Sequence, residues 1–297
     1  MLRLSDPDRY QAGLREMRQG CPSPKAMMSF RDADIVEAVL LSVAQRHSGP
    51  PRFLEWGTGL STAYYTRRLA RQGDFLWVTL EYDREFFENR VAAQLSLWSP
   101  VHVITVDGPD SLSADLPREG VVALVFDAGR LSPAERESDR AANLDDYVAA
   151  PARLGGSFDA ILVDGRKRRR CLIEAARLVS DDGAVLLHDA SRPYYHCAWS
   201  EYRQSRRVGD DLWIGAQGAD LDLLLPPGAG DTTGEHDDLI ARLRYVLDEY
   251  GQLPLENLVG NPWIAYGYQP DLVEQALAAM KENGIIRWDG SVAELSR

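Results

Sequence analysis

Two glycines and a carboxylate lie close together in the segment FLEWGTGLST, residues 53–62. Because Gly57 and Gly59 lack a Cβ atom, a ligand can approach the main chain of such a turn closely. Glu55 precedes Gly57 by two residues, and its carboxylate would repel the diphosphate of a dinucleotide. A small molecule that carries positive charge would instead be attracted. The spacing therefore favours a turn that holds a cationic ligand.

Two more carboxyl groups follow apolar runs further along the chain. Glu81 ends the run VTLE about twenty residues after the glycines, where a carboxylate can accept hydrogen bonds from both hydroxyls of a ribose. Tyr82 is its neighbour in the chain. Asp107 follows the run at residues 101–106 and could bind the amino group of an adenine. These positions predict that the ligand contains a nucleoside.

Titratable side chains also follow two later apolar runs, at residues 158–163 and 184–188. Asp164, His188 and Asp189 would converge at one edge of a sheet, because ligands in open α/β sheets bind beyond the carboxyl ends of the strands. His188 could act as a general base that removes the proton of an acceptor hydroxyl. It could equally be a strand-end histidine bonded to the backbone, and the sequence leaves both interpretations open.

Five consecutive basic residues, RKRRR at 166–170, follow Asp164 in an otherwise acidic chain. They are either the solvated face of a helix or part of a substrate site. Cations at a helix N-terminus oppose the helix dipole, which makes the first explanation slightly costly. In the second, Arg166 would act with Arg192 and Tyr195 to grip a carboxylate or phosphate on the substrate.

The elements that must position these groups form a doubly wound α/β sheet, because short apolar runs alternate with helix-like stretches. The predicted strands are 52–55, 75–81, 101–106, 158–163 and 184–188, and the predicted helices are 61–71, 84–97, 167–179 and 193–206. The runs 212–217 and 221–225 are separated by three residues only, which suits an antiparallel hairpin. A strand-like run at 121–127 is either an extra edge hairpin or a sign that the strand numbering is shifted by one.

These motifs resemble those of class I S-adenosylmethionine-dependent methyltransferases, whose acidic-x-Gly-x-Gly turn is followed by an acidic residue at the end of the second strand. The resemblance covers roughly residues 50–225, and Leu60 follows the second glycine where a third often stands. It implies a mostly parallel, seven-stranded, Rossmann-like sheet that ends in an antiparallel hairpin. It also implies that S-adenosylmethionine is bound by Glu55, Gly57, Thr58, Gly59, Ser61, Glu81, Tyr82 and Asp107.

The activity that the resemblance implies is methyl transfer to a small molecule, and we expect O-methyl transfer to an anionic acceptor. The metal-dependent catechol-type branch of the family has an Asp after strand four, a Lys three residues later and an Asp-Asn pair after strand five. Asp164, Lys167 and Asp189 occupy matching positions, so Asp164 and Asp189 could hold a divalent cation such as Mg²⁺. Ala190 replaces the Asn of that branch, so one ligand is missing.

Two other functions fit parts of the same pattern. The glycine turn and Glu81 are also compatible with an NAD-dependent oxidoreductase, although Thr62 occupies the position of a third glycine. A methyltransferase-like scaffold could also bind a nucleoside and catalyse nothing. The oxidoreductase differs from the methyltransferase in its ligand, and the scaffold differs from it in catalysing no reaction.

A chain of 297 residues is long enough for one α/β core with extensions, and its 45% hydrophobic and 26% charged residues are ordinary for a globular protein. We expect a helical N-terminal lid at residues 1–48, a cofactor-binding core at 49–227 and a helical C-terminal extension at 228–297. The aromatic residues of that extension could pack internally or form a homodimer contact.

The formal net charge of -12 argues against a nucleic-acid binder, which needs clustered cations for phosphate contacts. The cysteines Cys21, Cys171 and Cys197 are too few and too scattered for a disulfide framework or a zinc site with paired ligands. No apolar stretch reaches the length of a signal-peptide core or a membrane span. We therefore expect a cytoplasmic protein whose partner is a small molecule and neither nucleic acid nor membrane.

Overall fold

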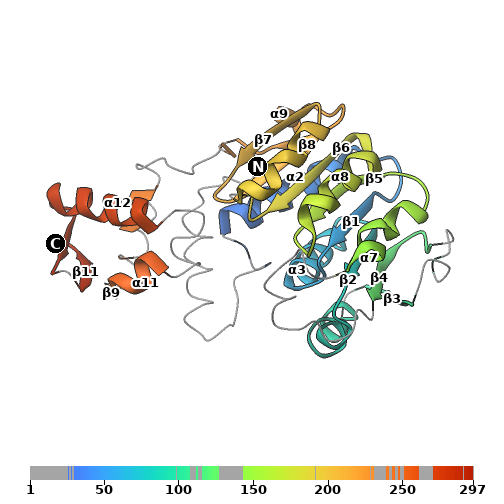
Figure 1. Cartoon of the computed structure of the whole chain (residues 1–297), viewed down its shortest axis with the longest axis horizontal. Coiled ribbons are helices and arrows are strands. Elements are labelled where there is room, and N and C mark those ends of the chain that lie inside the picture. Colours follow the sequence, from blue (N-terminus) through green and yellow to red (C-terminus); the bar gives the residue numbers. More distant parts are fainter. Residues whose placement is uncertain are drawn as a thin grey trace.

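The computed structural model describes two separate sheets with their helices (Figure 1). Its described residues are 30–97, 99–107, 116–126, 143–190, 192–227, 229–230, 239–240, 251–260, 270–289 and 291–296, together with 26, 28, 112, 243, 244 and 247. The strands of the larger sheet are β1 (Arg52–Trp56), β2 (Leu76–Glu81), β3 (Val101–Val106), β4 (Gly120–Phe126), β5 (Phe158–Val163), β6 (Val179–His188), β7 (Gln204–Val208) and β8 (Leu212–Ala216).

The larger sheet has the strand order β3-β4-β2-β1-β5-β6-β8-β7. The first six strands in this order are parallel, whereas β8 runs antiparallel to β6, and β7 antiparallel to β8. The predicted fold class, a doubly wound and mostly parallel sheet closed by an antiparallel hairpin, is confirmed. The sheet has eight strands rather than the seven expected.

Helices precede, connect and follow these strands. Those of the α/β unit are α2 (Phe30–Arg46), α3 (Leu60–Leu69), α4 (Arg84–Phe86), η2 (Phe87–Val91), α5 (Ala92–Leu95), α7 (Asp145–Ala149), η4 (Ala150–Arg153), α8 (Arg168–Leu178), η5 (Pro193–Glu201) and α9 (Leu221–Leu224). The predicted helices at 61–71 and 167–179 are confirmed as α3 and α8. The predicted helix at 193–206 ends early, because η5 is followed by strand β7.

The closing hairpin lies one segment earlier than predicted. It pairs β7 with β8, and the run at 221–225, which we expected to be its second strand, contains helix α9 instead. Asp220 caps that helix, because its side chain accepts a hydrogen bond from the amide of Asp222 at 2.9 Å. The positive φ of Gly209, 60°, lets the chain turn between β7 and β8.

The run that the sequence left unassigned is β4, and it lies between β2 and β3. All seven residues of β4 are buried, as expected for a parallel strand that is covered on both faces. Strand β3 is therefore the edge of the sheet, and its residues are more exposed. The strand numbering inferred from the sequence was thus short by one after β3.

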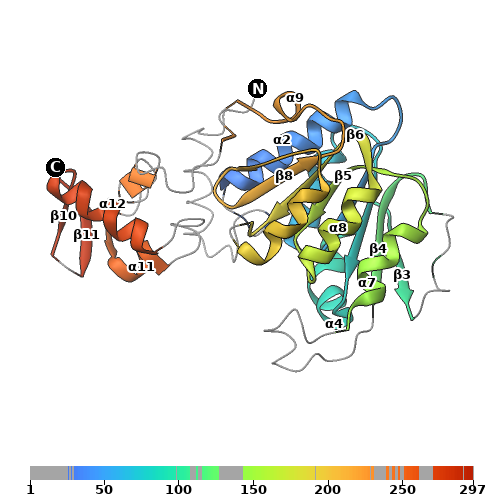
Figure 2. The same ribbon diagram turned by 45° about the horizontal axis from the view of Figure 1, so that its top comes forward.

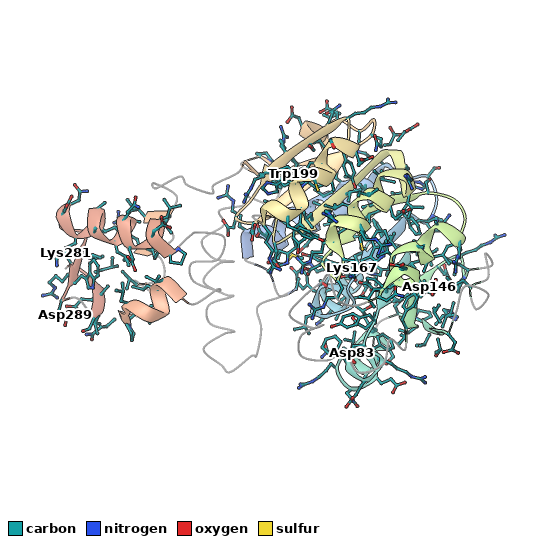
Figure 3. The ribbon with its side chains drawn as sticks, in the orientation of Figure 1. Asp83, Asp146, Lys167, Trp199, Lys281 and Asp289 are labelled. Carbon is teal, nitrogen blue, oxygen red and sulfur yellow. The ribbon has the colours of Figure 1, made fainter. Side chains whose placement is uncertain are left out.

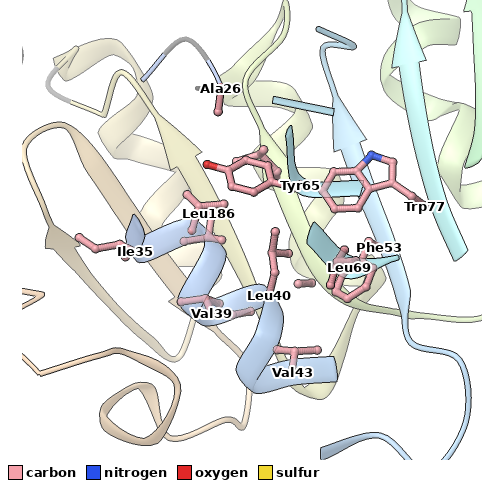
Figure 4. Packing of buried hydrophobic residues seen from close by; sticks show 14 of the residues in the cluster. Ala26, Ile35, Val39, Leu40, Val43, Phe53, Tyr65, Leu69, Trp77 and Leu186 are labelled. Atoms are coloured by element: carbon pink, nitrogen blue, oxygen red, sulfur yellow. The ribbon is translucent and has the colours of Figure 1, made fainter. Parts of the chain in front are cut away.

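Two hydrophobic clusters cover the two faces of the sheet. Because side chains alternate along a strand, Phe53 of β1 packs with the cluster that contains α2 and α3 residues, whereas its neighbour Leu54 packs with the cluster of α7 and α8. Figure 4 shows side chains of α2, among them Leu40 and Val43, on the same side of the sheet as Phe53, with Trp77 beside Tyr65 of α3. Figure 2 shows α7 and α8 beside each other along the sheet.

Helix α2 belongs to the segment expected to form a helical lid, and it packs against the sheet. A buried carboxylate fastens it to the closing hairpin. Asp32 accepts hydrogen bonds from the amides of Asp210, at 2.7 Å, and Asp211, at 3.1 Å. The turn between β7 and β8 is thereby held by a residue that lies far earlier in the chain.

The C-terminal unit has its own core, formed around α12 (Pro270–Glu282). It also contains α11 (Leu255–Gly260), β9 (Gln252–Pro254), β10 (Ile286–Trp288) and β11 (Val292–Leu295). The strands form an antiparallel sheet in the order β10-β11-β9, which the sequence did not predict. Helix α12 agrees with the helical character expected of residues 228–297, of which 231–238, 248–250 and 261–269 lie outside the described residues. The homodimer contact stays a prediction.

Within the described part of the chain, no helix combines the length and the apolar character needed to cross a membrane. Cys171 and Cys197 are free thiols, and Cys21 lies outside the described residues.

Candidate functional site

A cavity of about 630 Å³ opens at the carboxyl ends of β1, β2 and β5. This is the edge at which ligands bind in open α/β sheets. It is lined by Gly57, Thr58, Gly59, Leu60, Ser61, Glu81, Tyr82, Asp83, Phe86, Asp164, Gly165, Arg166, Arg168, Arg192, Tyr194 and Tyr195. Most of the residues predicted to bind cofactor or substrate therefore lie around one cavity.

The two glycines of the turn have different roles. Gly57 has a φ of 103°, and a Cβ atom at this position would lie 2.6 Å from the Cα of Gly165, so only glycine fits. Gly59 has an extended φ of -171°, and a Cβ atom there would meet no atom within 4 Å. Since Gly59 lines the cavity, its missing side chain leaves room for a ligand rather than for the protein.

The amide groups of the turn are already bonded within the protein. The amides of Gly57 and Thr58 donate to the carbonyl oxygen of Leu80, at 3.0 and 3.2 Å. The amide of Gly59 donates to the hydroxyl of Thr62 at 2.9 Å. A dinucleotide fold uses free amides at this place to bind a diphosphate. These bonds therefore make the turn a poor diphosphate site.

Glu55, which was predicted to face the ligand, lies beneath the turn and not among the residues that line the cavity. Its carboxylate is fully buried and accepts hydrogen bonds from Ser61 and Thr62, each at 2.5 Å, from Trp77 at 3.0 Å and from Thr79 at 3.2 Å. Strand alternation explains this placement, because Glu55 shares a face of β1 with Phe53, the face covered by α3. Burial raises the pKa of Glu55 from 4.5 to about 7. In the structure Glu55 holds the first turn of α3.

Glu81 lies at the carboxyl end of β2 and lines the cavity, as predicted for a ribose ligand. Its Oε1 accepts hydrogen bonds from the amides of Tyr82 and Asp83, both at 3.0 Å. Among the described residues, no donor is recorded for its Oε2. Burial raises the pKa of Glu81 to about 8, even though the bonds from the two amides act in the opposite direction.

Aromatic side chains flank this carboxyl group. Tyr82 was predicted at the site, and the guanidinium of Arg166 lies 5.4 Å from the centre of its ring and 3.3 Å from its hydroxyl. Phe86 was not predicted, although its side chain is 42% exposed and lines the cavity. Its position on the short helix after β2 is the signal that could have identified it.

Asp107, which was predicted to bind adenine, follows the edge strand β3. Strand β4 separates β3 from β2, and Asp107 is not among the residues that line the cavity. Strand β4, and not β3, is therefore the strand next to β2, and the position after it, 127, lies outside the described residues.

Arg168 ties together the carboxyl ends of β5 and β6, a role that the sequence did not reveal. One side of its guanidinium contacts Asp164, with Nη2 3.0 Å from Oδ1, and the other contacts Asp189, with Nη1 3.1 Å from Oδ2. It also donates to three backbone carbonyl oxygens, those of Asp164, Gly165 and His188. The side chain is mostly buried, so these charge-assisted bonds are well shielded from solvent.

His188 is a buried partner of Asp164 rather than a wall of the cavity. Its Nδ1 lies 2.8 Å from the Asp164 Oδ1, and its Nε2 lies 3.9 Å from an oxygen of Asp189. Burial lowers the pKa of His188, but the two carboxylates outweigh this effect and raise it from 6.5 to about 9. A histidine that is protonated at neutral pH and hidden from the cavity does not suit the predicted role of general base.

The predicted metal site does not fit these residues. The guanidinium of Arg168 contacts both Asp164 and Asp189, so a divalent cation there would meet a positive charge instead of free oxygens. No cluster of three or more potential metal ligands occurs in the part of the chain that the structure describes. Lys167, the matching lysine, is labelled in Figure 3 and precedes α8 with a φ of 55°. It is not among the residues that line the cavity.

The predicted substrate residues Arg166, Arg192 and Tyr195 all line the cavity, together with Tyr194. Arg192 is 61% exposed, and its Nη2 lies 2.9 Å from the Oδ2 of Asp189. Asp189 has a φ of 55°, a conformation that few residues other than glycine adopt. An irregular backbone at this strand end thus directs a carboxylate toward two arginines.

No family model and no curated protein match the chain. Solved structures that it resembles include a methyltransferase-like protein from Silicibacter pomeroyi, with 21% identity over 64% of this chain and 94% of that one and a TM-score of 0.37. A cofactor-bound protein from MTB has 20% identity over 71% and 90%, with a TM-score of 0.40. The spermidine synthase of Thermotoga maritima has 15% identity over 64% and 59%, with a TM-score of 0.38.

These TM-scores are low, and the assignment of the fold depends on the observed sheet itself. Six parallel strands, the glycine turn after β1, the acidic residue at the end of β2 and the closing antiparallel hairpin are the features that the sequence motifs implied. The α/β unit of this chain therefore has the class I methyltransferase fold.

Proposed function

We propose that the protein is an S-adenosylmethionine-dependent methyltransferase that transfers a methyl group to an oxygen of a small anionic acceptor. The observation that carries this proposal is the state of the glycine turn. Its three amides at Gly57, Thr58 and Gly59 are used within the protein, which disfavours a diphosphate and therefore NAD. The same turn shares a cavity with Glu81, whose Oε2 is available to a ribose.

The residues present fit S-adenosylmethionine. Glu81 would accept hydrogen bonds from the ribose hydroxyls, and the open space at Gly59 would admit the methionyl part of the molecule. When bound, S-adenosylmethionine supplies a methyl group on a positively charged sulfur. Glu55 would act from below, because it holds the first turn of α3 through Ser61 and Thr62.

The other end of the cavity favours an anionic acceptor. Arg166 and Arg192 line it beside Tyr195, and guanidinium groups bind carboxylates and phosphates well. The protein would promote the reaction mainly by orienting the acceptor, because holding two reactants in line removes much of the entropic barrier.

Isothermal titration of the full-length protein with S-adenosylhomocysteine tests the proposal. We expect binding, and we expect Glu81→Gln to weaken it by about 10- to 100-fold, the usual effect of losing a hydrogen bond to a charged group. Glu88→Gln is the matched control, because Glu88 is exposed, pairs with Arg84 on the surface and does not line the cavity. If S-adenosylhomocysteine does not bind at high micromolar concentration, and if the protein changes the fluorescence of reduced nicotinamide, the results would instead support the oxidoreductase.

A methyltransferase needs the bound cofactor for its function, whereas a scaffold that catalyses nothing does not. The Glu55→Ala variant tests this difference. If the variant no longer binds S-adenosylhomocysteine but keeps the biological function of the wild type, the protein is a scaffold.

A further inference from the structure

Three acidic residues occur among the described residues that line the cavity, and they lie at different ends of it. Glu81 and Asp83 follow β2, at the end that the proposed function assigns to the ribose. Asp164 follows β5, beside Arg166 and Arg168, and is paired with both His188 and Arg168. At the acceptor end, the described wall of the cavity therefore offers no carboxylate that is free of a cation.

His188 does not fill this gap. Its side chain is buried, it does not line the cavity, and its Nδ1 is occupied by Asp164. Among the described residues at the acceptor end of the cavity, no histidine and no unpaired carboxylate is placed to take a proton from the acceptor. An acceptor oxygen that is already ionised would need none.

Arg192 is placed to hold such an oxygen. It lines the cavity, and its contact with Asp189 through Nη2 leaves Nε and Nη1 without a recorded partner among the described residues. Asp189 fixes one edge of the planar guanidinium, so the remaining donors are directed by a bond that the protein already makes. A carboxylate oxygen can accept a charge-assisted hydrogen bond from either of these donors.

Arg192 shares the carboxylate of Asp189 with a second cation. The Oδ2 of Asp189 lies 2.9 Å from Arg192 and 3.1 Å from Arg168. This carboxylate is divided between two guanidinium groups, so its contact compensates the positive charge of Arg192 only in part. The remaining charge attracts an anion such as a carboxylate.

We infer that the acceptor is a small carboxylic acid, that Arg192 holds its carboxylate in the cavity, and that this carboxylate is itself the nucleophile, so that the product is a methyl ester. This inference rests on the proposed function. One carboxylate oxygen forms a bond to the methyl carbon, the carbon–sulfur bond breaks, and its electron pair stays on sulfur. The negative and positive charges cancel, and no proton is transferred.

Saturation-transfer NMR on the full-length protein with S-adenosylhomocysteine tests binding of the acceptor. The probes are benzoate and phenylacetate, their primary amides, and phenyl phosphate. We expect the carboxylates to bind and the amides not to. Arg192→Gln should weaken carboxylate binding by about 10- to 100-fold. Arg177→Gln is the matched control, because Arg177 is likewise exposed and pairs with an acidic residue three positions earlier, Glu174, but lies outside the cavity.

Amides that bind as well as the carboxylates, phenyl phosphate that binds better, or carboxylate binding that Arg192→Gln leaves unchanged would each overturn the inference. A second measurement follows the product formed from S-adenosylmethionine with a labelled methyl group. Release of the label as volatile methanol in mild base supports a methyl ester, and a base-stable product overturns it. Failure of S-adenosylhomocysteine to bind at all would instead overturn the proposed function.

Discussion

Replacing Glu55 with Gln should remove the part of the pH dependence of stability that comes from this carboxyl group, leaving the parts that come from Asp32 and Glu81. The pKa of Glu55 is raised from 4.5 to about 7, because its carboxylate is fully buried. A carboxyl group with a raised pKa contributes stability that is fully present below pH 4.5 and is lost as the pH rises through 7. Between pH 5.5 and pH 8, this linkage acts only up to the pKa of about 7, which is a span of about 1.5 pH units. At about 1.36 kcal/mol per unit, the wild-type protein loses about 2 kcal/mol of stability from this group.

Urea unfolding followed by tryptophan fluorescence measures this effect, and Trp56 and Trp77 are buried next to the site. At pH 5.5, Glu55→Gln should cost only about 1 kcal/mol, because the hydroxyl of Ser61 can rotate and accept a bond from the new amide. Between pH 5.5 and pH 8 the wild-type protein should lose about 2 kcal/mol more than the variant. Glu88→Gln is the control, since it removes an exposed carboxylate instead.

An identical loss of stability with pH in the wild-type protein and in Glu55→Gln would refute the reasoning. The same variant separates the two roles considered for this residue. If Glu55 acts only by holding the first turn of α3, the affinity of the Glu55→Gln protein for S-adenosylhomocysteine should differ from that of the wild type by less than about tenfold, the equivalent of about 1.4 kcal/mol. A larger loss with unchanged stability would support the direct contact with the cofactor that the sequence predicted.

Three further predictions follow from the cavity. Gly57→Ala should destabilise the protein by more than about 3 kcal/mol in urea unfolding, because the new Cβ atom would lie 2.6 Å from the backbone of Gly165. Gly59→Ala should leave the stability unchanged, because its Cβ atom would meet no protein atom, and should weaken the binding of S-adenosylhomocysteine in calorimetry. Arg168→Gln should cost about 3 kcal/mol in urea unfolding, since it leaves two partly buried carboxylates without their shared cation; a loss below about 1 kcal/mol would contradict this. Because the pKa of Glu81 is about 8 and a ribose favours the ionised form, binding should release protons and strengthen as the pH rises to 8, which calorimetry in two buffers of different ionisation enthalpy can detect.

Features that are determined by residues close together in the chain, namely single strands and turns, could be predicted from the sequence. The runs that became β1, β2, β3, β5 and β6 were predicted, as was the glycine turn after β1. Strand β7 was missed because it is an edge strand whose residues QSRRV are mostly exposed, so no apolar alternation marks it. Strand β4 was recognised as strand-like, but its insertion between β2 and β3 depends on pairing that a single run does not encode.

The sequence identified groups at the site more reliably than it identified their directions. Glu81 and Arg192 line the cavity as expected. Glu55 does not, because the alternation of β1 turns it toward α3, and the sequence alone did not say which face of β1 was covered by which helix. Arg168 is one of five adjacent basic residues, and only the placement of α8 against the ends of β5 and β6 distinguishes it from the others.

The bond between Asp32 and the hairpin turn has a practical consequence for anyone who trims this gene for expression. A fragment that starts at residue 49 would lose α2, would strip the apolar cover from one side of the sheet, and would leave two amides in the β7–β8 turn without an acceptor. Such a fragment should aggregate on overproduction, and shortened versions that stay monodisperse should begin before residue 30. Helix α2 is, in this sense, a structural part of the α/β unit and not an optional cover.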